Sequence, residues 1–214
     1  MNKLSPIRIG VLGVAAIVPM ALTNPARSVH SAQILAIAAR DPKRAYRFAK
    51  KYNIPRVHQT YAALLADPDI DAIYNPLPNS LHAEWTIRAL KAGKHVLCEK
   101  PMASNAEEAQ EMAAVAHQTG RVLSDAFAYR SHPLTAKLKE IIQSGDLGQV
   151  YYYDSIRVNL GLFQRDVSVI SDLAVHDFSI LDYLLGEHPV AVSANGMNHF
   201  PGTPENLAYL RGLQ

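Results

Sequence analysis

The chain has 214 residues, of which 49% are hydrophobic and 19% are charged, and its formal net charge is +2. It therefore has enough apolar sequence for a sizeable core, in one large domain or two modest ones. A net charge so close to zero gives no electrostatic reason to expect nucleic acid or a membrane surface as a partner.

The cysteine content and the N-terminal residues bear on the compartment. A single cysteine, Cys98, excludes an internal disulfide and favours a reducing compartment, so we expect a cytoplasmic protein. Residues 9–22 are apolar enough to resemble the core of a signal peptide, but Gly10, Gly13 and Pro19 interrupt them. No stretch has the ~18 uninterrupted apolar residues that a membrane-spanning helix needs.

Short apolar runs alternate with helical patterns as far as residue 126. Strands are expected at residues 7–14, 34–39, 71–76, 95–98 and 121–126, and helices at residues 16–28, 41–52, 60–68, 80–93 and 104–120. This alternation predicts a parallel sheet joined by right-handed crossovers. The strands are apolar throughout, which indicates burial on both faces. We therefore predict an α/β domain over residues 1–126, with a parallel sheet and helices on both faces.

The pattern changes after residue 126. A helix is expected at residues 133–145, an alternating, half-exposed strand at 150–160, a helix at 171–186 and a strand at 190–197. The segment PENLAYL, residues 204–210, indicates the beginning of one more strand. We therefore predict that residues 127–214 form an incomplete α+β domain for substrate binding or oligomerisation.

The segment GVAAIV follows the first strand and can be compared with the dinucleotide fingerprint G-x-G-x-x-G/A. Gly13 would form the tight turn, Ala15 stands where a second glycine lets the pyrophosphate approach, and Val18 stands at the third position. One glycine of three is a weak match, and a generic strand–turn–helix explains the segment as well. On the dinucleotide interpretation the fold is of the Rossmann type, and Gly13, Ala15, Ala16 and Ile17 contact the cofactor.

The end of the second strand, ARD, lies where the ribose-recognising residue of such a fold is expected. A carboxylate there would accept a hydrogen bond from the ribose 2′-OH of NAD, whereas Arg40 would pair with the 2′-phosphate of NADP. Asp41, followed by Pro42, is needed as the N-cap of the next helix. We therefore expect NADP or NAD, with NADP favoured. The basic residues from Arg40 to Lys51 fit a solvated helix face or, at Arg40, a phosphate site.

Two further segments follow buried strands, at the edge where ligands of an open parallel sheet bind. Lys100, after the fourth strand, is expected to project toward the nicotinamide and to polarise an alcohol oxygen or carry its proton. A solvated loop lysine is the alternative. NPLPNSLH, after the third strand, is expected to wall the cofactor, although prolines and a helix cap explain it without a function. The expected cofactor contacts in these two segments are Asn75, Pro76, Leu77, Asn79, His82, Glu99 and Lys100.

Asp172 and His176 are four residues apart in the helix expected at residues 171–186, so they share one helix face. Asp172 could orient the imidazole of His176 and favour its protonated form, although a histidine on a helix is commonly structural. We expect no metal site, because His82, His95 and Glu99 come from separate elements without ligand spacing.

Four segments carry a resemblance to a known family. They are IRIGVLGVAAIVP, AARDPKRAYRFAKKY, IYNPLPNSLHAEWTIRALKAGKHVLCEKPMASNAEEA and DLAVHDFSILDYLLG, and their order and spacing extend over about residues 7–210. Together they resemble the Gfo/Idh/MocA oxidoreductase family, including members in nucleotide-sugar and polysaccharide metabolism and NADP-dependent dihydrodiol dehydrogenases. The resemblance implies hydride transfer between NAD(P) and a carbon of a sugar or cyclitol.

The resemblance also implies roles for three catalytic residues. Lys100 matches the lysine of the family's E-K-P motif and would stabilise a developing alkoxide. Asp172 and His176 match the acidic residue and the acid/base histidine of inositol-dehydrogenase-like members, so His176 would take the hydroxyl proton.

Two departures from the family pattern qualify these expectations. Ala15 and Val18 stand where the family usually has a smaller residue at one or both places, which weakens the expected pyrophosphate site. The chain also stops before the further strands of the family, so we expect a fragment or a frameshifted product with an exposed sheet edge. A catalytically inactive dinucleotide-binding fragment is therefore the alternative function. The homo-oligomer implied for full-length members is doubtful for this chain.

Overall fold

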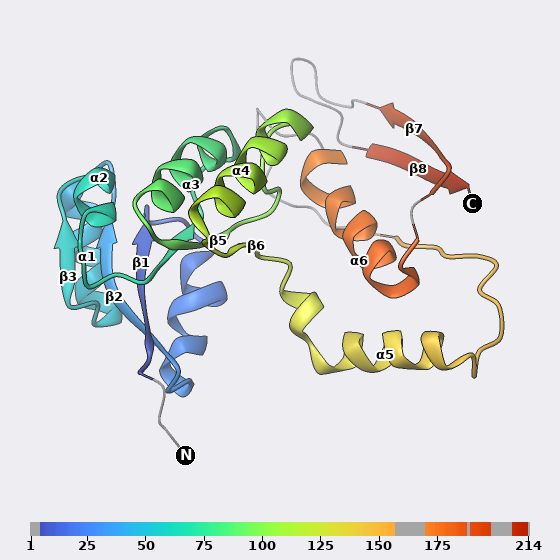
Figure 1. Cartoon of the computed structure of the whole chain (residues 1–214), viewed down its shortest axis with the longest axis horizontal. Coiled ribbons are helices and arrows are strands. Elements are labelled where there is room, and N and C mark those ends of the chain that lie inside the picture. The colour runs from blue at the N-terminus through green and yellow to red at the C-terminus, as the bar shows by residue number, and fades with distance from the viewer. Residues whose placement is uncertain (1–4, 157–169, 188, 198–206, 214) are drawn as a thin grey trace. The chain divides into compact units, whose positions relative to one another are not determined.

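The computed structural model describes residues 5–156, 170–187, 189–197 and 207–213 (Figure 1). The chain divides into two compact units, Met1–Ala126 and Phe127–Gln214. Each unit has a sheet of its own. Among the described residues, no helix is both long enough and apolar enough to cross a membrane.

The first unit is built on a six-stranded parallel sheet with the order β3-β2-β1-β4-β5-β6. The strands are β1 (Ile7–Leu12), β2 (Ala32–Ala38), β3 (Arg56–His58), β4 (Ala72–Asn75), β5 (His95–Cys98) and β6 (Leu123–Asp125). This is the strand order of the Rossmann fold, in which the chain switches direction across the sheet between β1 and β4. The predicted Rossmann-type sheet is confirmed, although the short strand β3 was not expected.

Helices cover both faces of this sheet, as predicted. They are α1 (Pro42–Tyr52), α2 (Tyr61–Leu65), α3 (His82–Lys91) and α4 (Ala106–Thr119). Leu12 and Ile73 lie in a core that also contains residues of α2, α3 and α4. Their strand neighbours Val11 and Tyr74 lie in a second core with residues of α1. The two cores lie on opposite faces because successive side chains of a strand point in opposite directions.

Capping side chains explain where two of these helices begin. Asp41 accepts hydrogen bonds from the backbone nitrogens of Lys43 and Arg44, at 2.9 and 3.4 Å, and is the N-cap of α1 as predicted. The cap of α4 is Asn105, whose side chain accepts from the nitrogen of Glu108 at 2.8 Å. The Glu108 carboxylate accepts in return from the nitrogen of Ser104 at 2.9 Å. Asn105 and Glu108 thus satisfy backbone donors at the start of α4 in the manner of a capping box.

The helix expected at residues 16–28 is not continuous. A π-helical turn, η1 (Pro19–Thr23), is followed by a 3₁₀ turn, η2 (Pro25–Ser28). Each begins with a proline, which has no N–H to continue a helix from the preceding turn. The two prolines therefore divide the segment.

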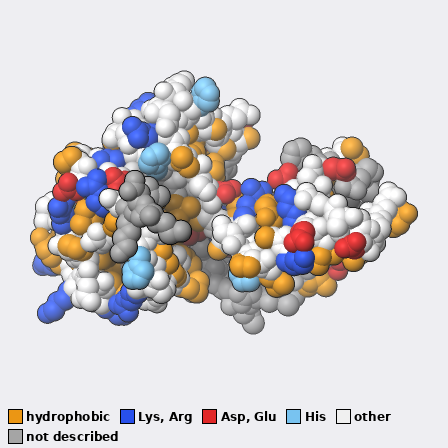
Figure 2. All heavy atoms as spheres, turned by 60° about the horizontal axis from the view of Figure 1, so that its bottom comes forward, with side chains coloured by type: hydrophobic (Ala, Val, Ile, Leu, Met, Phe, Trp, Pro, Cys, Tyr) orange, Lys and Arg blue, Asp and Glu red, His pale blue; other side chains and the backbone are white. Residues whose placement is uncertain are grey.

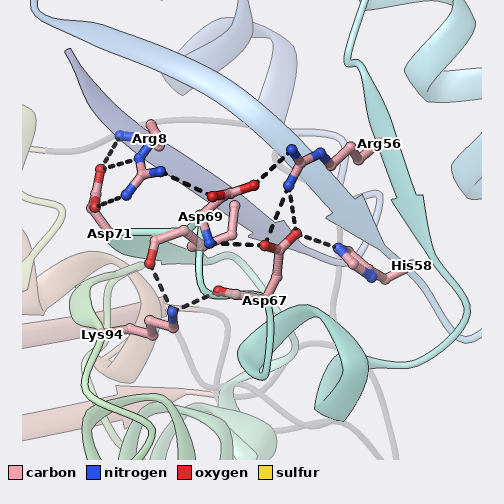
Figure 3. Close-up of polar contacts among 8 residues, drawn as sticks. Arg8, Arg56, His58, Asp67, Asp69, Asp71 and Lys94 are labelled. Atoms are coloured by element: carbon pink, nitrogen blue, oxygen red, sulfur yellow. Dashed lines mark hydrogen bonds and ion pairs between the residues drawn. The ribbon is translucent and has the colours of Figure 1, made fainter. Parts of the chain in front are cut away.

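A network of charged side chains ties together the amino ends of the central strands (Figure 3). Arg8, in β1, donates from Nε and Nη2 to the two oxygens of Asp71 at 2.9 and 2.7 Å. These hydrogen bonds hold the pKa of Asp71 at about 2, below its ordinary value. The buried Lys94 donates to the backbone oxygens of Asp67 and Ile70, at 2.7 and 2.8 Å. The network fixes the turn between α2 and β4, at the opposite end of the strands from the ligand-binding edge.

The described residues of the second unit form helices and an antiparallel strand pair. Its elements are the 3₁₀ turn η4 (Ala128–Ser131), α5 (Pro133–Ser144), the π-helical turn η5 (Ile170–Ala174), α6 (Val175–Leu185), β7 (Ala191–Met197) and β8 (Leu207–Leu213). β7 and β8 pair from Ala191 opposite Leu213 to Met197 opposite Leu207. The predicted partial α+β arrangement after the Rossmann fold is confirmed.

The strand expected at residues 150–160 is not observed over residues 150–156, and the rest of it lies outside the described residues. A strand needs a partner for its backbone N–H and C=O groups. Tyr151, Tyr152 and Ile156 are 86%, 81% and 76% exposed, so an alternating pattern was not sufficient to bury this segment.

On the face in Figure 2, hydrophobic side chains lie at the surface, and Lys and Arg are scattered rather than gathered in one basic patch.

Candidate cofactor-binding and active site

Gly13 forms the turn that ends β1. Its φ is +81°, a conformation that favours glycine, and its N–H donates to the oxygen of Ala38 at 2.6 Å. A Cβ at Gly13 would lie 3.0 Å from Cδ2 of Leu77 and 3.7 Å from the hydroxyl oxygen of Tyr61. The turn after β1 therefore lies against the end of β2, the segment after β4 and α2. A side chain would fill this space, so glycine is required here.

The remaining fingerprint residues differ in exposure. Ala15 packs beside the core on the α1 side, Ala16 is exposed and Ile17 is half-buried. Val18, at the third fingerprint position, is fully buried in the same core. The departure from a small residue at this position is therefore accommodated by packing.

Arg40 is exposed immediately after β2, where the sequence placed it. Arg44, which sequence reasoning did not single out, reaches the oxygen of Val14 in the fingerprint turn with its Nη2 at 3.4 Å. Tyr61 was also missed: its phenol lies near the backbone of Arg40, and burial raises its pKa. The basic run from Arg40 to Lys51 offered a signal for Arg44. Nothing in the local sequence pointed to Tyr61.

The segment after β4 directs its polar side chains inward. Asn75 is fully buried; its Nδ2 donates to the oxygen of His82 at 3.2 Å and to Oγ1 of Thr86 at 3.1 Å. Its Oδ1 accepts from the nitrogen of Leu77 at 3.3 Å. His82 is 1% exposed, and Pro76 and Leu77 are buried too. Of the five residues predicted to contact the cofactor here, only Asn79 has a half-exposed side chain.

Lys100 lies on a turn that is held on both sides. Before it, the nitrogen of Glu99 donates to the oxygen of Asn75 at 3.0 Å, and the Glu99 carboxylate accepts from Tyr74 Oη at 2.5 Å. Burial and this hydrogen bond raise the pKa of Tyr74. After it, the oxygen of Pro101 faces Nδ1 of His82 at 2.8 Å. Lys100 itself is half-buried, and the Lys100–Pro101 peptide bond is cis.

Cys98, at the end of β5, is fully buried, as the sequence indicated. Burial raises the pKa of its thiol to about 12. Its sulfur donates to the oxygen of Met102 at 3.7 Å. Cys98 therefore supports the Lys100 turn and is not a nucleophile.

Asp172 and His176 lie in the second unit, on η5 and in the first turn of α6. The helix expected at residues 171–186 is thus a π-helical turn that continues into an α-helix. The His176 ring lies edge-on to Phe127, with centroids 5.4 Å apart, and 6.1 Å from the ring of Tyr129. The Tyr129 hydroxyl donates to the oxygen of His176 at 3.0 Å. Two aromatic residues that sequence reasoning missed therefore fix this histidine.

The structure brings the predicted residues together in two groups. Gly13, Arg40, the segment after β4 and Lys100 all follow the carboxyl ends of strands in the first unit, where a parallel sheet binds its ligands. Asp172 and His176 form the second group, in the other unit. Among the residues that the structure describes, no group of three or more His, Cys, Asp or Glu side chains could hold a metal ion.

Comparison with known protein families identifies the family of this chain. The family model described as "Oxidoreductase family, NAD-binding Rossmann fold" matches residues 7–127, which is more than half of the chain. A second family model, for the Gfo/Idh/MocA C-terminal domain, matches residues 135–210. The chain belongs to the Gfo/Idh/MocA family of oxidoreductases. The resemblance inferred from the four sequence segments is thereby confirmed.

Three similar members of this family illustrate the range. A D-xylose 1-dehydrogenase (NADP(+)) 2 from Haloferax volcanii is 43% identical over 92% of this chain and 58% of its own length. A trans-1,2-dihydrobenzene-1,2-diol dehydrogenase from Bos taurus is 34% identical over 86% and 57%. The crystal structure of a 3-ketoreductase from Actinomadura kijaniata in complex with NADP and TDP-benzene gives a TM-score of 0.73 and 32% identity, over 89% and 60%. The chain thus spans less than two thirds of each relative.

Proposed function

We propose that the protein is an NADP-dependent oxidoreductase that interconverts an alcohol and a carbonyl on a sugar-like substrate. The observation that carries this proposal is the turn of Lys100, which follows β5 at the ligand-binding edge of a Rossmann sheet and is fixed at Glu99 and Pro101. Family membership and the relatives named as a D-xylose 1-dehydrogenase and a 3-ketoreductase support this substrate class.

The cofactor fits the residues at this edge. Gly13, with a φ of +81°, forms the tight turn after β1 that a dinucleotide-binding edge requires, and the close approach of Leu77 leaves no room for a Cβ there. Arg40, after β2, and Arg44, in the first turn of α1, are exposed and would provide two guanidinium groups for a 2′-phosphate, which favours NADP over NAD. Of the residues after β4 that were predicted to contact the cofactor, Asn79 is the one with a half-exposed side chain. When bound, the cofactor would accept the hydride as NADP⁺ during oxidation and supply it as NADPH during reduction.

The chain's own residues would manage the proton and the charge on oxygen. Lys100 would donate a hydrogen bond to the substrate oxygen and stabilise negative charge that develops there. His176, held by Phe127 and Tyr129, would take the hydroxyl proton during oxidation and return it during reduction. Asp172, one helical turn earlier, would favour the protonated imidazole.

Titration with NADPH, followed by its fluorescence, tests cofactor binding. Turnover is then measured with D-xylose, nucleotide sugars and dihydrodiols for the wild type, Lys100→Met and the control Lys91→Met, an exposed lysine of α3. We expect Lys100→Met to lower kcat by about 10²–10⁴-fold and Lys91→Met to leave it unchanged. Binding without turnover on any of these substrates would favour the inactive dinucleotide-binding protein, and absence of binding would exclude both functions.

A further inference from the structure

His82, the first residue of α3, lies between two backbone carbonyl groups. Its Nε2 is 2.7 Å from the oxygen of Leu77, in the segment after β4, and its Nδ1 is 2.8 Å from the oxygen of Pro101, in the turn after β5. The side chain is 1% exposed, so water does not compete for either nitrogen. One buried ring therefore bridges the segment that follows β4 and the turn that follows β5, both at the ligand-binding edge of the sheet.

Both partners of His82 can only accept hydrogen bonds. A carbonyl oxygen has no proton to donate, and a neutral imidazole carries one N–H, so a neutral ring can bond to only one of the two oxygens. Bonds to both require the doubly protonated imidazolium. Both ring nitrogens lie within hydrogen-bond distance of their carbonyl oxygens, at 2.7 and 2.8 Å.

The surroundings of the ring hold its backbone in place. The His82 carbonyl accepts from Nδ2 of Asn75, whose amide also donates to Thr86 on the next turn of α3. The segment from Pro76 to Leu81 contains no titratable side chain. On the other segment the titratable groups are Cys98, Glu99 and Lys100, and Glu84 is the first acidic residue of α3.

We propose that His82 is a positioning residue that, as an imidazolium, clasps the segment after β4 to the turn that carries Lys100. It reaches Lys100 through the carbonyl of Pro101, the next residue, and makes no contact with the substrate. His82 was expected from the sequence to contact the cofactor directly, and the clasp replaces that role. The link to catalysis rests on the proposed function of Lys100, whereas the protonation of the ring does not.

The first experiment observes the ring itself. Protein labelled with ¹⁵N-histidine is studied by imidazole ¹H–¹⁵N correlation at neutral pH without cofactor, and the His82 ring is assigned through its own backbone amide. We expect both ring nitrogens of His82 to carry a proton. One unprotonated ring nitrogen would overturn the clasp. The outcome is independent of whether the chain binds NADPH or turns over a substrate.

The second experiment measures the consequence for Lys100. His82→Gln is compared with His95→Gln, a histidine at the amino end of β5 whose Nδ1 accepts from the nitrogen of Val122. A glutamine amide cannot place N–H donors in the two opposite directions of the imidazolium ring. We therefore expect His82→Gln to lower kcat by roughly 10–100-fold and to change the affinity for NADPH by less than about threefold. An unchanged kcat would contradict the positioning role. If His82→Gln does not fold, the ring spectrum decides.

Discussion

Tyr74, buried in β4, donates a hydrogen bond to the half-buried Glu99, which follows β5, with the phenol oxygen 2.5 Å from the carboxylate. Tyr74 is 1% exposed, so the hydroxyl has no access to water and depends on Glu99 for its acceptor. Glu99 in turn precedes Lys100 directly. The pair therefore anchors the Lys100 turn from within the core of the first unit.

Removing the Tyr74 hydroxyl should destabilise the protein. Tyr74→Phe leaves the Glu99 carboxylate without its buried donor, and we expect the free energy of unfolding to fall by about 1–3 kcal/mol. Urea denaturation followed by circular dichroism measures the change. Tyr46→Phe, which removes an exposed hydroxyl on α1, should cost much less. Equal losses would show that the buried pair has no special contribution.

The acid stability of the first unit should depend on Asp71. Its pKa is lowered to about 2 by Arg8, so its stabilising contribution is present above its unfolded-state pKa and is lost as pH falls toward 2. Because both side chains are more than a third exposed, we expect Asp71→Asn to cost only about 1 kcal/mol at neutral pH. The gap from wild type should close in acid. Glu111→Gln, an exposed site on α4, is the control, and a pH-independent gap would contradict the linkage.

Arg40 should set the preference for the phosphorylated cofactor. Arg40→Ala removes a charged partner of the 2′-phosphate, so we expect NADPH affinity to fall about 10–100-fold and NADH affinity to change little. Arg44→Ala should have the same direction. Arg47→Ala, an exposed arginine further along α1, should affect neither cofactor. Parallel fluorescence titrations measure all three variants. Equal losses for NADPH and NADH would contradict 2′-phosphate recognition by Arg40.

Gly13→Ala should cost more stability than the same change at Gly120. Both glycines have positive φ, +81° and +62°, so alanine is strained at each by about 1–2 kcal/mol. Only at Gly13 does the added Cβ meet a neighbour, Cδ2 of Leu77 at 3.0 Å, whereas nothing lies within 4 Å at Gly120. Thermal unfolding of the two variants gives the comparison. A larger loss at Gly120 would contradict the close approach at Gly13.

Local sequence was sufficient for most of the first unit. Asp41 with Pro42 gave the start of α1 correctly, and uninterrupted apolar runs gave a parallel sheet covered on both faces. The strand β3 was missed because three residues are too few for a periodic signal. The strand predicted over residues 150–156 was wrong because an alternating pattern alone does not supply a pairing partner.

The candidate site was predictable only where strand ends carried it. Gly13, Arg40 and Lys100 all follow strands, and a parallel sheet brings such positions to one edge. Two contacts of the site join segments that are far apart in the sequence: Tyr74 in β4 bonds to Glu99 after β5, and His82 in α3 contacts Pro101 after β5. No spacing in the sequence encodes such contacts, since they depend on how the crossovers pack.

The position of Cys98 gives the protein an internal reporter. It is the chain's one cysteine, it is fully shielded, and its sulfur bonds to Met102 just beyond the Lys100 turn. An alkylating reagent can reach the Cys98 thiol only while that turn is open. The rate of alkylation therefore measures how often the turn opens, without any introduced label. Slower alkylation in the presence of a nucleotide would then report directly that the ligand closes this edge of the sheet.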